Sequence, residues 1–100
     1  MYINLLAYDA ECDELDLLID TRSPMAAESV PVGEGIYIRR EPSSGRVVGA
    51  FVRGYSRLLK KLHSGRQVSD ECAKQLGVQE AFMAVVQWLG DQDLPNHSLK

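Results

Sequence analysis

Residues 35–53, GIYIRREPSSGRVVGAFVR, decide the fold of this chain. Two runs of strand-forming residues, 36–39 and 46–53, flank Pro42-Ser43-Ser44-Gly45, a combination that favours a tight turn. Both faces of 47–52 are apolar or small, which is typical of a strand in the middle of a sheet under a covering layer. The stretch therefore predicts an antiparallel hairpin whose second strand is central.

The sequence before this hairpin predicts further strands. Residues 2–8 are rich in strand formers, and the polar run 9–14 then reads as a turn. In 15–20 apolar and acidic residues alternate, which indicates a half-buried strand. Residues 21–27 predict a loop, and 28–32 a short edge strand in which Pro31 is tolerated.

The sequence after the hairpin changes to a helical period at Gly54. Tyr55, Leu58, Leu59 and Leu62 form the apolar stripe of a first helix that ends at Ser64-Gly65. A second helix is expected from an N-cap at Ser69 to Leu76, and a third over about 78–89, closed by Gly90.

These patterns together predict an α+β fold: an antiparallel sheet of four to five strands, followed by two or three C-terminal helices packed on it. A chain of 100 residues fits a single domain. We divide it into a sheet region (2–53), a helical region (54–90) and a flexible tail (91–100). The third helix is apolar on several sides because of Met83 and Trp88, so we expect it to meet another subunit in a homo-oligomer.

Charge is sorted along the chain. Residues 1–38 carry eight acids and one base, and residues 39–66 carry eight bases and one acid, within a total charge of −3. The strongest chemical signal is the basic set Arg53, Arg57, Lys60 and Lys61, which offers cations to the phosphates of a nucleic acid. The alternative is a solvated face whose cations pair within the fold, for example Asp16 or Asp20 with Arg46 or Arg53. On the first helix, Arg57, Lys60 and Lys61 have no acidic partner.

No motif predicts catalysis, a metal or a cofactor. The acids Asp9, Glu11, Asp13 and Asp20 have calcium-loop spacing, but Glu14 stands where that loop needs glycine, so we expect a solvated turn. Ser56 lacks the second glycine of a nucleophile elbow, and His63 is no evident base for it. We expect Cys12 and Cys72 to be small core residues and free thiols. The glycines match no nucleotide-binding fingerprint.

The beginning of the chain has neither a basic leader nor a long apolar run. With only two cysteines, it predicts a cytoplasmic protein that does not enter membranes.

Two segments together resemble a bacterial family known as domain of unknown function 2283. One is Tyr8-Asp9-x-Glu11-x-Asp13-x-Leu15-x-Leu17, and the other combines Gly35-Ile36-Tyr37-Ile38 with Gly45-Arg46-Val47-Val48-Gly49. The likeness covers about residues 2–58. It implies an antiparallel sheet, no known catalysis and a partnership with small toxin-like proteins. Arg53-Gly54-Tyr55-Ser56 departs from the acidic Leu-Asp-Ala-Ser-like end of the family, and the helices after His63 extend beyond its usual length.

The leading hypothesis is thus a non-enzymatic protein-interaction domain, antitoxin-like or regulatory, that binds another protein or itself. The first alternative is a nucleic-acid-binding protein that uses the basic helical face. The second is a small hydrolase that uses Ser56 or Cys72 with His63.

Overall fold

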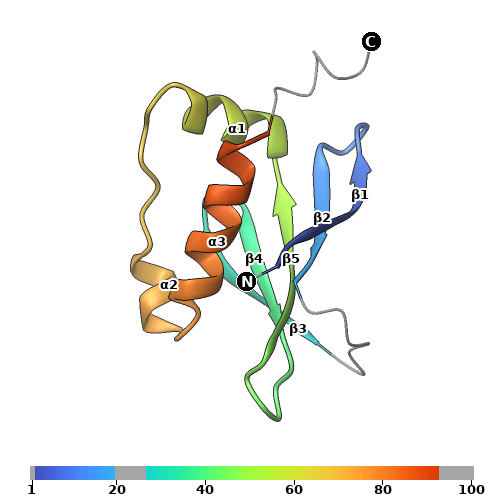
Figure 1. Cartoon of the computed structure of the whole chain (residues 1–100), viewed down its shortest axis with the longest axis vertical. Coiled ribbons are helices and arrows are strands. Elements are labelled where there is room, and N and C mark those ends of the chain that lie inside the picture. The colour runs from blue at the N-terminus through green and yellow to red at the C-terminus, as the bar shows by residue number, and fades with distance from the viewer. Residues whose placement is uncertain (1, 20–26, 93–100) are drawn as a thin grey trace.

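The strands of the protein form one antiparallel sheet in the computed structural model, which describes residues 2–19 and 27–92. They are β1 (Asn4–Asp9), β2 (Glu14–Leu18), β3 (Glu28–Gly33), β4 (Ile36–Arg40) and β5 (Val47–Arg53). Their order across the sheet is β1-β2-β5-β4-β3 (Figure 1). β5 is central, as its two apolar faces predicted, and β1 and β3 are the edges.

The helices follow the sheet in the chain and cover one of its faces. They are α1 (Tyr55–His63), α2 (Glu71–Gln75) and α3 (Gln79–Gly90). α1 contacts α3, while α2 lies beside the edge strand β3 and also contacts α3 (Figure 1). The predicted α+β architecture, an antiparallel sheet followed by C-terminal helices, is confirmed.

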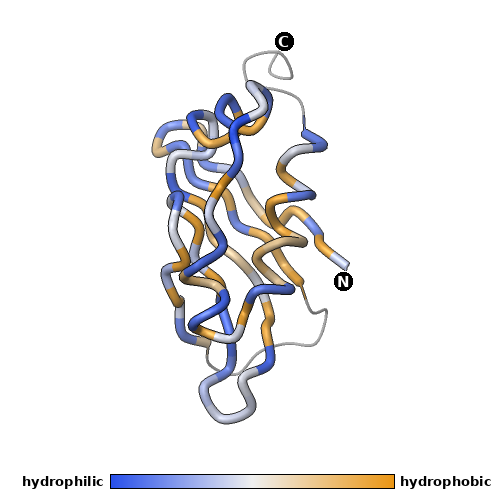
Figure 2. The backbone as a smooth tube through the Cα atoms, turned by 90° about the vertical axis from the view of Figure 1, so that its left-hand side faces the viewer, coloured by the Kyte–Doolittle hydropathy of each residue, from blue (hydrophilic) through white to orange (hydrophobic). Residues whose placement is uncertain are grey.

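The core lies between the helices and the sheet because alternate strand residues point to the same face. Hydrophobic stretches run along the strands and along α3, whereas the β4–β5 turn is hydrophilic (Figure 2). Each of three strands contributes a pair of buried side chains: Leu15 and Leu17, Ile36 and Ile38, and Ala50 and Val52. α1 and α3 cover them with fully buried side chains: Leu59, Phe82, Val85 and Leu89.

The other face of the sheet carries polar and aromatic side chains. Asp16, Phe51 and Tyr37 stand in register across β2, β5 and β4. The rings of Tyr37 and Phe51 pack with their centroids 6.0 Å apart. All three residues are half-buried, so this face remains open to solvent over the aromatic pair.

The element boundaries differ slightly from those predicted. α2 begins after Asp70 instead of Ser69, although the Ser69 hydroxyl accepts a hydrogen bond from the Glu71 amide at 3.3 Å. Residues 21–26 of the loop predicted over 21–27 lie outside the described residues, as do Asp20 and the tail from residue 93.

The expectation that both cysteines belong to the core is wrong. Cys12 and Cys72 are exposed free thiols. Cys12 lies in the β1–β2 turn, and Cys72 lies on the outer side of α2, whose one buried residue is Ala73. Residues 9–12 of the turn are all exposed, and α2 turns Ala73, the neighbour of Cys72, toward the core.

Candidate functional site: a cationic groove

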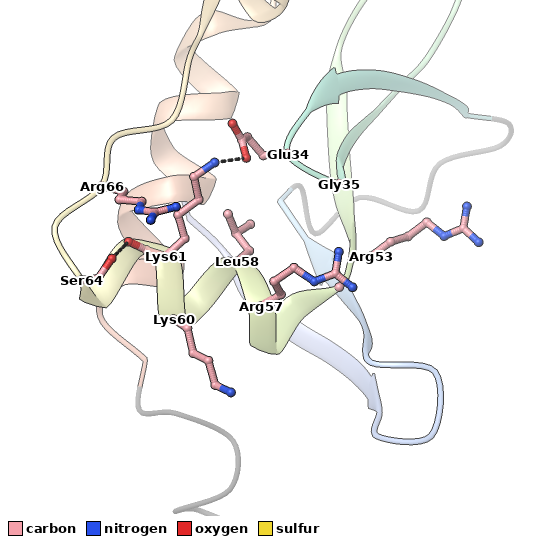
Figure 3. A pocket seen from close by; sticks show the side chains of 10 residues that line it. Glu34, Gly35, Arg53, Arg57, Leu58, Lys60, Lys61, Ser64 and Arg66 are labelled. Carbon is pink, nitrogen blue, oxygen red and sulfur yellow. Dashed lines mark hydrogen bonds and ion pairs between the residues drawn. The ribbon is translucent and has the colours of Figure 1, made fainter.

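A groove of about 660 Å³ opens where β5 ends and α1 begins (Figure 3). Its walls are the β3–β4 turn, the β5–α1 junction, α1 and the segment that follows α1. Cations dominate the lining: Arg53, Arg57, Lys60, Lys61 and Arg66. Glu34 is the one acid among the lining residues, so their formal charge is +4. We call this site the cationic groove.

The groove contains all four basic residues that the sequence singled out. Within α1, Leu58 and Leu59 are buried against the core, and this orientation turns Arg57, Lys60 and Lys61 toward the groove side. Lys60 and Arg53 extend outward from its rim, as Figure 3 shows. The amphipathic period of the helix therefore places its cations together on one wall.

Glu34 reaches the groove from the β3–β4 turn and pairs with Lys61. The Lys61 Nζ lies 2.7 Å from the Glu34 Oε1, and both side chains are about one quarter to one third exposed (31% and 26%). The sequence showed no acidic partner for Lys61 on its own helix, and the partner instead comes from a turn 27 residues earlier. One of the five cations is thereby neutralised.

Gly35 brings that turn close to the end of β5. Its carbonyl accepts a hydrogen bond from the Arg53 amide at 2.8 Å. Its φ is +80°, and a Cβ atom at this position would lie 2.3 Å from the Arg53 carbonyl oxygen. A glycine is therefore needed for the close contact between the β3–β4 turn and the end of β5.

Arg53 has partners on the open face of the sheet. Its Nε lies 3.5 Å from the Glu14 Oε2, and its side chain is 62% exposed. The interaction with the Tyr37 hydroxyl and the nearby Glu14 carboxylate raise the pKa of Arg53. The suggested pairing of Asp16 with Arg53 is wrong, because the register puts Asp16 opposite Phe51 and Glu14 opposite Arg53.

Asp20, the other suggested partner of Arg46 and Arg53, lies outside the described residues. Arg46 binds Glu41 across the β4–β5 turn, with 2.8 Å between Nη2 and Oε2. A second pair, Arg40 with Glu28 at 3.2 Å, joins β4 to β3. Three basic residues of the stretch 39–66, Arg40, Arg46 and Arg53, are therefore paired with acids of the sheet region.

The cations of the groove that remain are Arg57, Lys60 and Arg66. Within the described part of the chain, none of them takes part in an ion pair. Arg57, Lys60 and Arg66 are exposed. These three side chains are the ones best placed to bind an anion from solution.

Asp13 is a residue whose role the sequence did not reveal. Its carboxylate accepts hydrogen bonds from the Ser56 amide at 3.0 Å, the Ser56 hydroxyl at 2.7 Å and the Tyr8 hydroxyl at 3.0 Å. Its carbonyl accepts from the amides of Gly54 and Tyr55. Asp13 thus caps the start of α1 from the β1–β2 turn. The acidic turn, expected to be only solvated, therefore holds the N-terminus of this helix.

The hydrogen bonds of this region also bear on two hypotheses from the sequence, a hydrolase that uses Ser56 with His63 and a calcium loop that begins at Asp9. Ser56 donates its hydroxyl hydrogen to Asp13, while His63 is at the other end of α1, about 10 Å further along the helix axis. Asp9 accepts hydrogen bonds from the amides of Glu11 and Cys12. Across residues 2–19 and 27–92, no group of three or more His, Cys, Asp or Glu is placed to hold a metal ion.

Met83 and Trp88 do not join the groove. Both lie on α3, where Met83 is 49% exposed and Trp88 is half-buried against the core. The six residues proposed from the sequence therefore form two separate sets, and four of them share one site.

None of the helices in the described ranges has the length and apolar character needed to cross a membrane. No family model, no curated protein and no solved structure matches this chain. The resemblance to domain of unknown function 2283 stays a prediction.

Proposed function

We propose that this protein is a non-enzymatic binding module whose cationic groove holds the phosphate groups of a nucleic acid. The observation that carries the proposal is the set of three unpaired cations, Arg57, Lys60 and Arg66, around a groove of net charge +4. In this proposal the protein acts in the cytoplasm, which agrees with the free thiols of Cys12 and Cys72.

The lining of the groove favours phosphates over a protein segment. Leu58 is the one lining residue with a large apolar side chain, and it is 5% exposed. Interfaces between proteins usually depend on apolar or aromatic anchors that enter pockets. Phosphate oxygens instead need charged donors, which Arg and Lys supply here.

The aromatic pair on the open face supports a single-stranded ligand. Arg53 belongs to the groove and contacts Tyr37, which packs on Phe51. A basic groove beside aromatic side chains is the combination with which proteins bind single strands, because unpaired bases stack on the rings. A strand whose phosphates enter the groove would pass Arg53 to reach these rings.

The test is a fluorescence-anisotropy titration with a labelled single-stranded DNA, a duplex of the same sequence and a poly-glutamate peptide. We expect the single strand to bind best, with a log Kd that depends on log salt with a slope of about 2, or about 0.7 for each of three phosphate contacts. Reversing two unpaired cations (R57E/K60E) is expected to weaken binding by at least about tenfold and to flatten that slope.

The control is K74E on α2, which reverses one exposed cation outside the groove and is matched to the single reversal K60E. We expect its affinity for the single strand to stay close to that of the wild type. Equal binding by R57E/K60E and K74E would refute the proposal. Tighter binding of poly-glutamate than of DNA would favour an acidic protein partner instead.

Protein interaction, including self-association, is the second candidate function. The observation that favours it is the group of exposed apolar side chains near the N-terminus: Tyr2 (74%), Leu5 (53%) and Leu6 (56%). An antitoxin-like or regulatory role with such a partner stays a prediction from the sequence.

A further inference from the structure

We propose that the outer edge of β1 is a self-association surface, on which β1 of a second copy of this chain pairs antiparallel. The resulting dimer would contain one continuous sheet. This inference rests on the second candidate function, self-association, and is independent of nucleic-acid binding, because β1 contributes no residue to the cationic groove.

The first argument is the hydrogen-bonding capacity of the edge. β1 pairs with β2 on one side only, and no strand of the described residues pairs with its other side. The amides and carbonyls along an unpaired edge are a template for another strand.

The second argument is the side chains that this edge presents. Five large hydrophobic side chains are exposed in the described ranges, and three of them, Tyr2, Leu5 and Leu6, lie in or just before β1. In Figure 2 the segment next to the N label is largely hydrophobic, with a hydrophilic interruption. Leu5 stands opposite the buried Leu17, so it extends the core face of the sheet, yet it remains 53% exposed. A strand added next to β1 would cover it.

The third argument is the absence of the features that protect edges. Strands at free edges commonly carry lysine, proline or an inward-pointing charge. Residues 2–8 contain none of these. The one protective feature of β1 is the bulge between Leu5 and Ala7, and the extra residue there, Leu6, is apolar. The other edge strand, β3, differs: it contains Pro31, pairs Glu28 with Arg40 and is flanked by α2.

The distribution of apolar side chains and charge along β1 fits a second β1 in antiparallel orientation. Asp9, Glu11, Asp13 and Glu14 are all at or beyond one end of β1, and residues 2–4 at its other end contain no acid. A second β1 in antiparallel orientation would place the two acidic turns at opposite ends of the shared seam. Parallel pairing would put them side by side, and like charges would oppose it. A two-fold symmetric contact of this kind is also the commonest form of soluble dimer.

The experiment is sedimentation-velocity analysis of the full chain over a wide range of concentrations. We expect twice the monomer mass for the wild type, and the monomer mass for L6K, because a lysine at this position charges the edge. The control is M83K, which charges an exposed apolar residue on α3 instead. It should remain dimeric, and circular dichroism should show all three proteins to be folded.

Each other outcome overturns the proposal. A wild-type monomer at every concentration, or aggregates without a discrete dimer, would remove it. A dimer that M83K dissociates and L6K does not would move the interface to α3. As a second variant, R57E/K60E should dimerise like the wild type, which separates a failure of this surface from a failure of the groove.

Discussion

The Asp13 carboxylate holds the Ser56 amide and hydroxyl at 3.0 and 2.7 Å, across 43 residues of sequence. The contact ties the β1–β2 turn to the first turn of α1, whose own N-cap, Gly54, has no side chain to offer. Because α1 carries three of the groove cations, the position of that wall depends on a turn that is distant in sequence but lies beside the end of β5.

Replacing Asp13 is therefore expected to destabilise the protein. D13A removes every side-chain acceptor at the start of α1 and should lower the free energy of unfolding by roughly 1–2 kcal/mol. D13N keeps one oxygen acceptor, and asparagine tolerates the left-handed φ of +56° at this position, so its loss should be smaller. Urea denaturation measures both.

A double-mutant cycle checks that the partner is Ser56. The losses in the free energy of unfolding caused by D13A and S56A should be less than additive, because both substitutions remove the same contact between hydroxyl and carboxylate. Additive effects, or equal losses for D13A and D13N, would contradict the capping role.

The Gly35 position should be unusually intolerant. G35A forces a Cβ to within 2.3 Å of the Arg53 carbonyl oxygen and also places a side chain at φ +80°. G45A is the matched control, because Gly45 has a similar φ of +74° but open space around it. We expect G45A to cost about 1 kcal/mol and G35A clearly more, as measured by thermal and urea unfolding. Equal losses would mean that the turn moves aside freely.

Removing Glu34 should strengthen anion binding. E34Q releases Lys61 from its 2.7 Å partner and raises the charge of the groove lining from +4 to +5. Single-stranded DNA should then bind a few-fold more tightly, with a salt slope steeper by about 0.7. The control E71Q changes the same charge on α2, outside the groove, and should leave the slope unchanged. A slope that E34Q does not change would show that Lys61 makes no phosphate contact.

Cys12 should react slowly for an exposed thiol. The Asp9 carboxylate and its hydrogen bond raise the pKa of Cys12, so less thiolate is present at a given pH. In a C72S background, iodoacetamide should therefore modify Cys12 with a rate profile whose midpoint lies above that of an ordinary cysteine. D9N removes the charge but keeps the acceptor oxygen, and should shift the profile to lower pH. E28Q, on β3, should not shift it.

The sheet was predictable where local patterns determine it. The hairpin around Pro42–Gly45 and the central place of β5 follow from turn residues and from a strand apolar on both faces. Local patterns did not determine the pairing of β2 with β5. The paired residues are 31 to 39 positions apart in the sequence, and their register depends on packing under the helices.

The residues that the groove takes from α1 were predictable, and those it takes from other segments were not. Helical spacing placed Arg57, Lys60 and Lys61 on one side of α1. Glu34, Gly35 and Arg66 reach the groove through tertiary contacts that no periodicity contains. The capping by Asp13 was missed because its three neighbouring acids suggested a solvated turn, and the hydrogen-bond donors it serves lie 43 residues later.

The central place of β5 also has a consequence for the order of events during synthesis. β5 is the strand that joins the β1–β2 hairpin to the β3–β4 hairpin. Until residue 53 has left the ribosome, these two hairpins have no shared neighbour, and both expose the side chains that α1 and α3 later cover. Because such long-range pairing forms slowly, we expect chains stalled before β5 to be the species most dependent on chaperones.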